Sequence, residues 1–202
     1  VVIILFKEQI NRKVLFRTEV ENKTKVPIIG EIVQVTSKDP IVILDGKRTV
    51  TAEQIRTIRT NLNFMGLNEE NKIALITSSI SGEGKSFVAI NLAISFTLTG
   101  KKVALLEMDL RKPKIFGDFN TNNKYGISNY LTGEVSLSDI INTTKIPGLD
   151  VATSGPIPPN PSELLMGDKN SKLIDELKKT YDYIIIDSPP VGLVAAIGRA
   201  HV

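Results

Sequence analysis

The sequence contains no cysteine and no tryptophan, and only one of its 202 residues is histidine. Without cysteine the chain can form no disulfide, thiolate zinc site, iron–sulfur cluster or cysteine nucleophile, and it suits a reducing compartment. The single histidine, His201, stands near the end of the sequence, so we expect neither a serine–histidine triad nor a multi-histidine metal site. Aromatic residues make up 5% of the chain, too few for surfaces that stack on single-stranded nucleic acid, and we expect no nucleic-acid partner.

Long hydrophobic runs are also lacking, since the apolar run Val1–Phe6 is far shorter than the ~20 residues that span a bilayer. Residues 1–25 carry six Lys and Arg against three Glu, whereas the rest of the chain is balanced in charge. An apolar stub followed by basic residues is typical of the cytoplasmic end of a transmembrane helix. Residues 1–25 are therefore interpreted as a juxtamembrane basic segment; a nucleic-acid arm, a membrane-surface stretch and a solvated lead-in are the alternatives.

The remaining sequence predicts an α/β fold with a mainly parallel sheet and helices on both faces. Aliphatic runs typical of strands buried on both sides alternate with segments of helical period. The first helix is expected to begin with Thr51 as its cap and Gln54 in a capping box. Residues 26–50 are interpreted as a linker with short strands. The predicted strands are Val26–Ile32, Ile41–Leu44, Lys72–Thr77, Val103–Met108, Leu149–Thr153 and Tyr183–Asp187, and the predicted helices after the first are Lys85–Thr99, Ile127–Leu131, Leu137–Ile141, Ser162–Met166 and Ser171–Thr180.

The segment Ser79–Ser86, SISGEGKS, lies between a predicted strand and a predicted helix, as in a phosphate-binding P-loop. Gly82 and Gly84 allow a tight turn that points successive N–H groups inward at a helix N-terminus. Lys85 is expected to contact the β- and γ-phosphates, and the Ser86 hydroxyl to bind magnesium. The predicted nucleotide-binding residues are Ser81, Gly82, Glu83, Gly84, Lys85, Ser86 and Phe87, with ATP and Mg²⁺ as the cofactors.

Carboxylates follow two of the predicted strands. Asp187 ends the aliphatic strand YIIID, where the carboxylate of a Walker B element stands, and we expect it to hold magnesium. Glu107 and Asp109 end the strand VALLEM and its continuation, and alternate residues of a strand share a face. We therefore expect both to project toward the same phosphates, one as a metal ligand and the other as acceptor of a proton from an incoming hydroxyl.

The segments SSISGEGKS, VALLEMDLRKP and YIIIDSPP together resemble the bacterial tyrosine kinases, the cytoplasmic part of polysaccharide co-polymerases. Asp109 and Arg111 match the family's D-x-D-x-R pattern, and Glu107 stands where the first aspartate is usual. The resemblance implies a P-loop NTPase-like fold and a Mg·ATP-dependent protein-tyrosine kinase with Lys85, Asp109, Glu107 and Arg111 as catalytic residues. It implies Ser86, Asp109 and Asp187 as metal ligands.

The stretch Glu53–Arg59 resembles the family's E-x-x-R-x-x-R motif through Glu53, Arg56 and Arg59. The resemblance implies that this helix docks on a neighbouring subunit in a ring-like homo-oligomer and presents its arginines there. An ordinary exposed amphipathic helix is the alternative. The other partners that the resemblance implies are a membrane activator segment and the polysaccharide export machinery, at the cytoplasmic face of the bacterial inner membrane.

The similarity ends near Val194, and residues 195–202 do not match the family. We expect an incomplete kinase domain over residues 51–194, without the last strands of the sheet and without the tyrosine-rich tail that accepts phosphate in the family. Autophosphorylation between subunits, regulating capsular or exopolysaccharide synthesis and export, is the predicted function. A non-catalytic, nucleotide-gated assembly or chain-length regulator is one alternative. A partitioning-type ATPase is the other, although its signature lysine would fall at Ile80.

Overall fold

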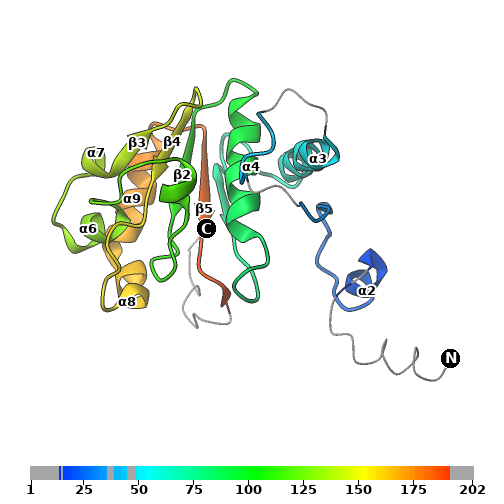
Figure 1. Ribbon diagram of the computed structural model, residues 1–202, viewed down its shortest axis with the longest axis horizontal. Helices are drawn as coiled ribbons and strands as arrows, with labels where there is room; N and C mark the ends of the chain where they lie inside the picture. Colours follow the sequence, from blue (N-terminus) through cyan, green and yellow to red (C-terminus); the bar gives the residue numbers. More distant parts are fainter. Residues whose placement is uncertain (1–13, 15, 36–38, 45–48, 192–202) are drawn as a thin grey trace.

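The computed structural model describes residue 14 and residues 16–35, 39–44 and 49–191 (Figure 1). The apolar run at the start of the chain and residues 195–202 lie outside the described residues. A short helix, α2 (Arg17–Glu21), is the first described element. Among the described residues, no helix combines the length and the hydrophobicity that crossing a bilayer requires.

One sheet of five strands forms the centre of the structure, in the order β1-β5-β2-β4-β3. The three pairings β1–β5, β5–β2 and β2–β4 are parallel, and β3 pairs with β4 in the antiparallel direction. The predicted α/β fold with a mainly parallel sheet is therefore confirmed. The strands are β1 (Ile73–Ile76), β2 (Val103–Glu107), β3 (Ile141–Thr143), β4 (Leu149–Ala152) and β5 (Tyr183–Asp187).

Helices cover both faces of this sheet, as Figure 1 shows. One core cluster joins α3 and α4 to one face, and a second joins α6 and α9 to the other. The central strands β2 and β5 are buried along their whole length, which explains why they carry aliphatic residues at successive positions rather than at alternate ones. The helices are α3 (Val50–Phe64), α4 (Lys85–Thr97), α5 (Ile115–Asp118), α6 (Ile127–Thr132), α7 (Leu137–Ile140), α8 (Pro161–Met166) and α9 (Asp168–Lys178).

Helix α4 is apolar around most of its circumference because it lies between the sheet and α3. Nine consecutive residues, Ala89–Thr97, are buried. Among them Phe96 stacks on Tyr183 of β5, with ring centroids 4.3 Å apart. This enclosure fixes the helix whose first turn follows the P-loop.

Helix α3 begins two residues earlier than expected. The side chain of Thr49, not Thr51, accepts a hydrogen bond from the N–H of Ala52, at 3.1 Å, and caps the helix. The predicted cap at Thr51 was wrong: Thr51 lies in the first turn and is buried. Gly66, with φ of 102°, follows the C-cap residue Met65, and glycine adopts this left-handed conformation without strain.

The linker forms no strand in its described residues 26–35 and 39–44, so the prediction of strands at Val26–Ile32 and Ile41–Leu44 was wrong. Its backbone polar groups bond instead to side chains of the helices. The N–H of Val33 donates to Gln54, and Asn61 donates to the carbonyl of Ile29. The linker therefore lies along α3 and α4 as an irregular strap rather than as part of a sheet.

Asn91 of α4 is the main attachment of the linker. This side chain is fully buried; it accepts a hydrogen bond from the N–H of Val42 at 2.9 Å and donates to the carbonyls of Pro40 and Phe87. All the polar atoms of a buried amide are thus satisfied by one segment of linker and by the helix itself.

We expect Asn91→Ala to lower the free energy of unfolding by about 1–3 kcal/mol, because partly buried backbone groups at Pro40 and Val42 lose their partner. Urea unfolding measures the change. Asn63→Ala, which alters an exposed amide of α3, is the matched control and should change stability by less than about 0.5 kcal/mol. Equal losses in the two variants would contradict the role given to Asn91.

Candidate functional site

The P-loop connects the end of β1 to the start of α4. Gly82 and Gly84 have φ of 95° and 90°, in the left-handed region, and Gly84 is the residue that precedes the first turn of α4. A residue with a Cβ atom would be strained at either position, so this backbone conformation favours glycine at both. The expected order of strand, glycine-rich turn and helix is present.

The backbone of this loop leaves a run of hydrogen-bond donors available. Within the described part of the chain, the N–H groups from Ser81 to Phe87 have no acceptor, whereas those of Ser79 and Ile80 donate to the Glu83 carboxylate at 2.7 and 3.3 Å. The run coincides with the residues predicted to bind the nucleotide, and adjacent free N–H groups at a helix N-terminus form an anion nest. Glu83 itself turns back and stabilises the start of the loop.

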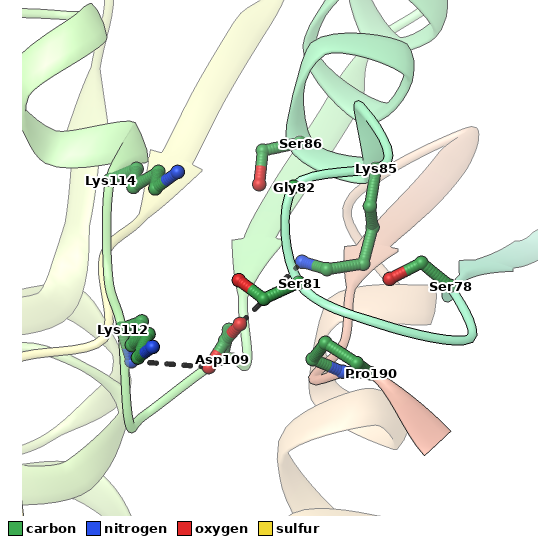
Figure 2. A pocket seen from close by; sticks show the side chains of 9 residues that line it. All are labelled: Ser78, Ser81, Gly82, Lys85, Ser86, Asp109, Lys112, Lys114 and Pro190. Atoms are coloured by element: carbon green, nitrogen blue, oxygen red, sulfur yellow. Dashed lines mark hydrogen bonds and ion pairs between the residues drawn. The ribbon is translucent and has the colours of Figure 1, made fainter. Parts of the chain in front are cut away.

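A pocket of about 330 Å³ opens beside this loop (Figure 2). Its walls come from the P-loop, from the loop after β2 and from the segment after β5. The lining residues are Ser78, Ser81, Gly82, Lys85, Ser86, Asp109, Lys112, Lys114 and Pro190.

Four of the predicted site residues, Lys85, Ser86, Asp109 and Asp187, lie together beside this pocket. The Nζ atom of Lys85 lies 2.5 Å from Oδ1 of Asp187 and 3.8 Å from Oδ2 of Asp109. Ser86 donates its hydroxyl hydrogen to Oδ2 of Asp187 at 2.7 Å. They meet because β5 lies between β1 and β2, so that the carboxyl ends of all three strands share one edge.

Burial raises the pKa of the Asp187 carboxyl, and the hydrogen bond and positive charge of Lys85 oppose that shift. The side chains of Lys85 and Asp187 are only 8% and 2% exposed, so each ion depends on the other for compensation. The hydroxyl of Ser86 and the carboxylates of Asp109 and Asp187 are hard oxygen donors of the kind that magnesium takes, and in this respect the residues present fit that ion.

Glu107 does not share the pocket with Asp109. Its buried carboxylate accepts hydrogen bonds from the backbone N–H groups of Lys114, of Ile115 at 2.5 Å and of Ser154 at 3.2 Å. The expected common face is absent because β2 ends at Glu107 and the strand alternation stops there. The structure therefore separates the acidic pair: Asp109 lines the pocket, and Glu107 joins two loops behind it.

Arg111 is not among the residues that line the pocket. Its Nη2 atom donates to the hydroxyl of Ser162 in α8 at 3.0 Å. The backbone beside it is held by Asp109, whose Oδ1 atom accepts from the N–H of Arg111 at 3.4 Å and of Lys112 at 3.2 Å. A catalytic role for Arg111 stays a prediction.

The three residues of the predicted interface motif lie in different surroundings. Glu53 and Arg56 form an exposed ion pair of 2.6 Å on α3. Arg59 instead donates to the backbone carbonyl of Ser95 in α4, at 2.6 Å, and burial together with Arg56 lowers its pKa. In this structure Arg59 joins the two helices; it is half-buried, as Arg56 is, whereas Glu53 is exposed.

Sequence reasoning gave no role to Ser78, Lys112, Lys114 and Pro190, which line the pocket. The lysines stand directly after the strand that carries the acidic pair, and their alternation with proline in K-P-K could have drawn attention to them. Spacing alone does not say toward which side an irregular loop points.

Three comparisons with known proteins agree with this geometry. Residues 70–198 match the family model described as an AAA domain. Tyrosine-protein kinase YwqD of Bacillus subtilis is 41% identical over 77% of this chain and 65% of its own length, and the putative tyrosine-protein kinase CapB of Staphylococcus aureus is 37% identical over 77% and 68%. The crystal structure of the chimerical protein CapA2B2 has a TM-score of 0.82 and 36% identity, covering 90% of this chain and 78% of that one. The chain thus spans about two thirds of the length of these curated relatives.

We expect Glu107→Gln to destabilise the fold by about 1–3 kcal/mol, because the amide turns one acceptor atom into a donor that faces a backbone N–H. Thermal unfolding measures this loss. Glu70→Gln makes the same change at an exposed carboxylate and should be neutral. An unchanged melting temperature in Glu107→Gln would show that the carboxylate does not hold these loops.

Proposed function

The chain belongs to the bacterial tyrosine-protein kinase family, and on that premise we propose that it transfers the terminal phosphate of ATP to tyrosine side chains of a neighbouring subunit. The observation that carries the proposal is the run of free N–H groups from Ser81 to Phe87 beside the Lys85 ammonium, in one pocket with the carboxylate of Asp109. Donors for phosphate and an acceptor for a proton lie together there, as phosphoryl transfer requires.

Each residue of the pocket has a part in this proposal. The loop N–H groups and Lys85 bind the phosphates and neutralise the charge that builds up during transfer. The phenol oxygen of the acceptor forms a bond to the terminal phosphorus, the bond from phosphorus to the bridging oxygen breaks, and ADP leaves. Asp109 accepts the phenol proton, since its carboxylate lines the pocket and is not enclosed like that of Asp187.

Ser86, Asp109 and Asp187 would hold Mg²⁺, which when bound screens the phosphate charge. Without it, Asp187 keeps Lys85 and Ser86 oriented toward the pocket through its two oxygens. In this proposal Glu107 does not contact the substrate but holds the loops that it joins. Arg111 likewise positions the loop after β2 through its hydrogen bond to Ser162 of α8.

Asp109→Asn should lower phosphate transfer from Mg·ATP to a tyrosine-containing peptide by about 100-fold or more, because the amide cannot accept the proton. Phosphotyrosine is measured by mass spectrometry. The matched control is Asp175→Asn, on the exposed surface of α9, which should keep full activity.

Two results would contradict the kinase proposal. In the first, the unaltered chain binds nucleotide but forms no phosphotyrosine. That result would favour the alternative of a nucleotide-gated assembly or chain-length regulator. In the second, Asp109→Asn and Asp175→Asn are equally active. That result would show that Asp109 is not the proton acceptor.

The proposed setting is the synthesis and export of capsular or exopolysaccharide at the cytoplasmic face of the bacterial inner membrane. Its support is the similarity to CapB and to the chimerical protein CapA2B2, whose name joins a CapA part to a CapB part. We propose a ring-like homo-oligomer in which α3 meets the neighbouring subunit, together with a membrane activator segment. The exposed pair Glu53 and Arg56 is the part of α3 available for such a contact.

Arg56→Glu should shift the chain toward smaller species in sedimentation velocity, because it reverses a charge on the proposed interface, while the melting temperature changes little. Lys101→Glu reverses an exposed charge away from α3 and should leave assembly unchanged. Equal sedimentation of Arg56→Glu and the unaltered chain would exclude this face.

A further inference from the structure

Lys112 and Lys114 add positive charge to the pocket beyond that of Lys85. Both follow β2 and both line the pocket, across from the P-loop (Figure 2). In the close-up, the Lys114 side chain extends from its loop toward the side on which Ser86 lies. The two lysines thus face the place where the P-loop nest would hold phosphates.

The charges of these lysines are less fully compensated than that of Lys85. Lys85 forms ion pairs with Asp187 and Asp109, whereas neither Lys112 nor Lys114 forms an ion pair within 4 Å of another described residue. Lys114 acts at longer range on Asp118: burial raises the pKa of that carboxyl, and the positive charge of Lys114 opposes the rise. An anion entering the pocket would therefore meet two ammonium groups that are not already neutralised at close range.

The backbone that carries the lysines is held in place, although their side chains are exposed. Asp109 accepts from the N–H of Lys112, and the buried carboxylate of Glu107 accepts from the N–H groups of Lys114 and Ile115. The carboxylates of Glu107 and Asp109 thus both hold the backbone of this loop. Fixed attachment points reduce the entropy lost when the ammonium groups bind a ligand.

We propose that Lys112 and Lys114 form a subsite for the terminal phosphate of a nucleoside triphosphate and make the pocket prefer a triphosphate over a diphosphate. This inference rests on the proposed function, because it places the phosphates in the same pocket. The chemical basis is charge: the terminal phosphate adds negative charge at the end of the nucleotide, and Lys85, which already forms ion pairs with Asp187 and Asp109, would neutralise only part of it.

The test compares two Mg²⁺ complexes, ADP and the non-hydrolysable triphosphate AMP-PNP, by isothermal titration with the full chain. The double variant Lys112→Ala/Lys114→Ala should weaken AMP-PNP binding by about tenfold or more and ADP binding by less than about threefold. Lys112→Arg/Lys114→Arg should keep the preference, because charge and not shape carries it. Added salt should reduce the difference between the two nucleotides.

The control Lys145→Ala/Lys172→Ala removes the same charge from exposed positions outside the pocket and should leave both affinities unchanged. Equal weakening of both nucleotides, or of neither, in the double variant would overturn the subsite. So would unchanged nucleotide affinities with a raised KM for an acidic acceptor peptide, which would assign the lysines to the acceptor. If the unaltered chain binds neither nucleotide, or if Lys85→Ala binds as well as it does, the nucleotide site itself is wrong and the proposed function fails with it.

Discussion

The buried ion pair between Lys85 and Asp187 is the interaction on which the arrangement of the site depends. Neither charge is stable in that place alone, because removing one partner leaves the other ion buried without compensation. Backbone hydrogen bonds also tie the end of β1 to the segment after β5: Ser188 donates its N–H to the carbonyl of Ile76, and Val191 donates to that of Ser78. The glycine-rich loop between β1 and α4 is thus held to β5 through Lys85 at its end and through Ser78 at its start.

The acidic pair after β2 shows how one strand end can serve two purposes. Asp109 lies beyond the strand and faces the pocket, whereas Glu107 is the last strand residue and faces inward toward the loops at Lys114 and Ser154. Burial raises the pKa of Glu107, and its backbone hydrogen bonds oppose that shift, so the carboxylate is stabilised by the same amides that it positions. The resemblance to other kinases pairs these two residues by sequence, but the geometry gives them different surroundings.

The part of the structure that follows from local sequence could be predicted. β5 has the bounds that its aliphatic run indicated, and α4 begins at Lys85 because the glycines before it cannot continue a helix. Other features could not be predicted, because each depends on contacts between segments far apart in the chain. They are the direction of the Glu107 side chain, the positions of Lys112 and Lys114, and the hydrogen bonds of the linker to Asn91. β3 was missed for the same reason: it is three residues long and exists by pairing with β4.

Asn91 lies on the same helix as Lys85, six residues further along, which corresponds to about 9 Å of helix length. Because α4 is enclosed by the sheet and by α3, it cannot bend easily between these two points. Lys85 at the start of α4 and the linker at residues 40–42, held by Asn91 at its middle, are therefore attached to one stiff helix. A displacement of the linker along the axis of α4 would therefore move the P-loop through the helix as a whole, with no change of secondary structure in between.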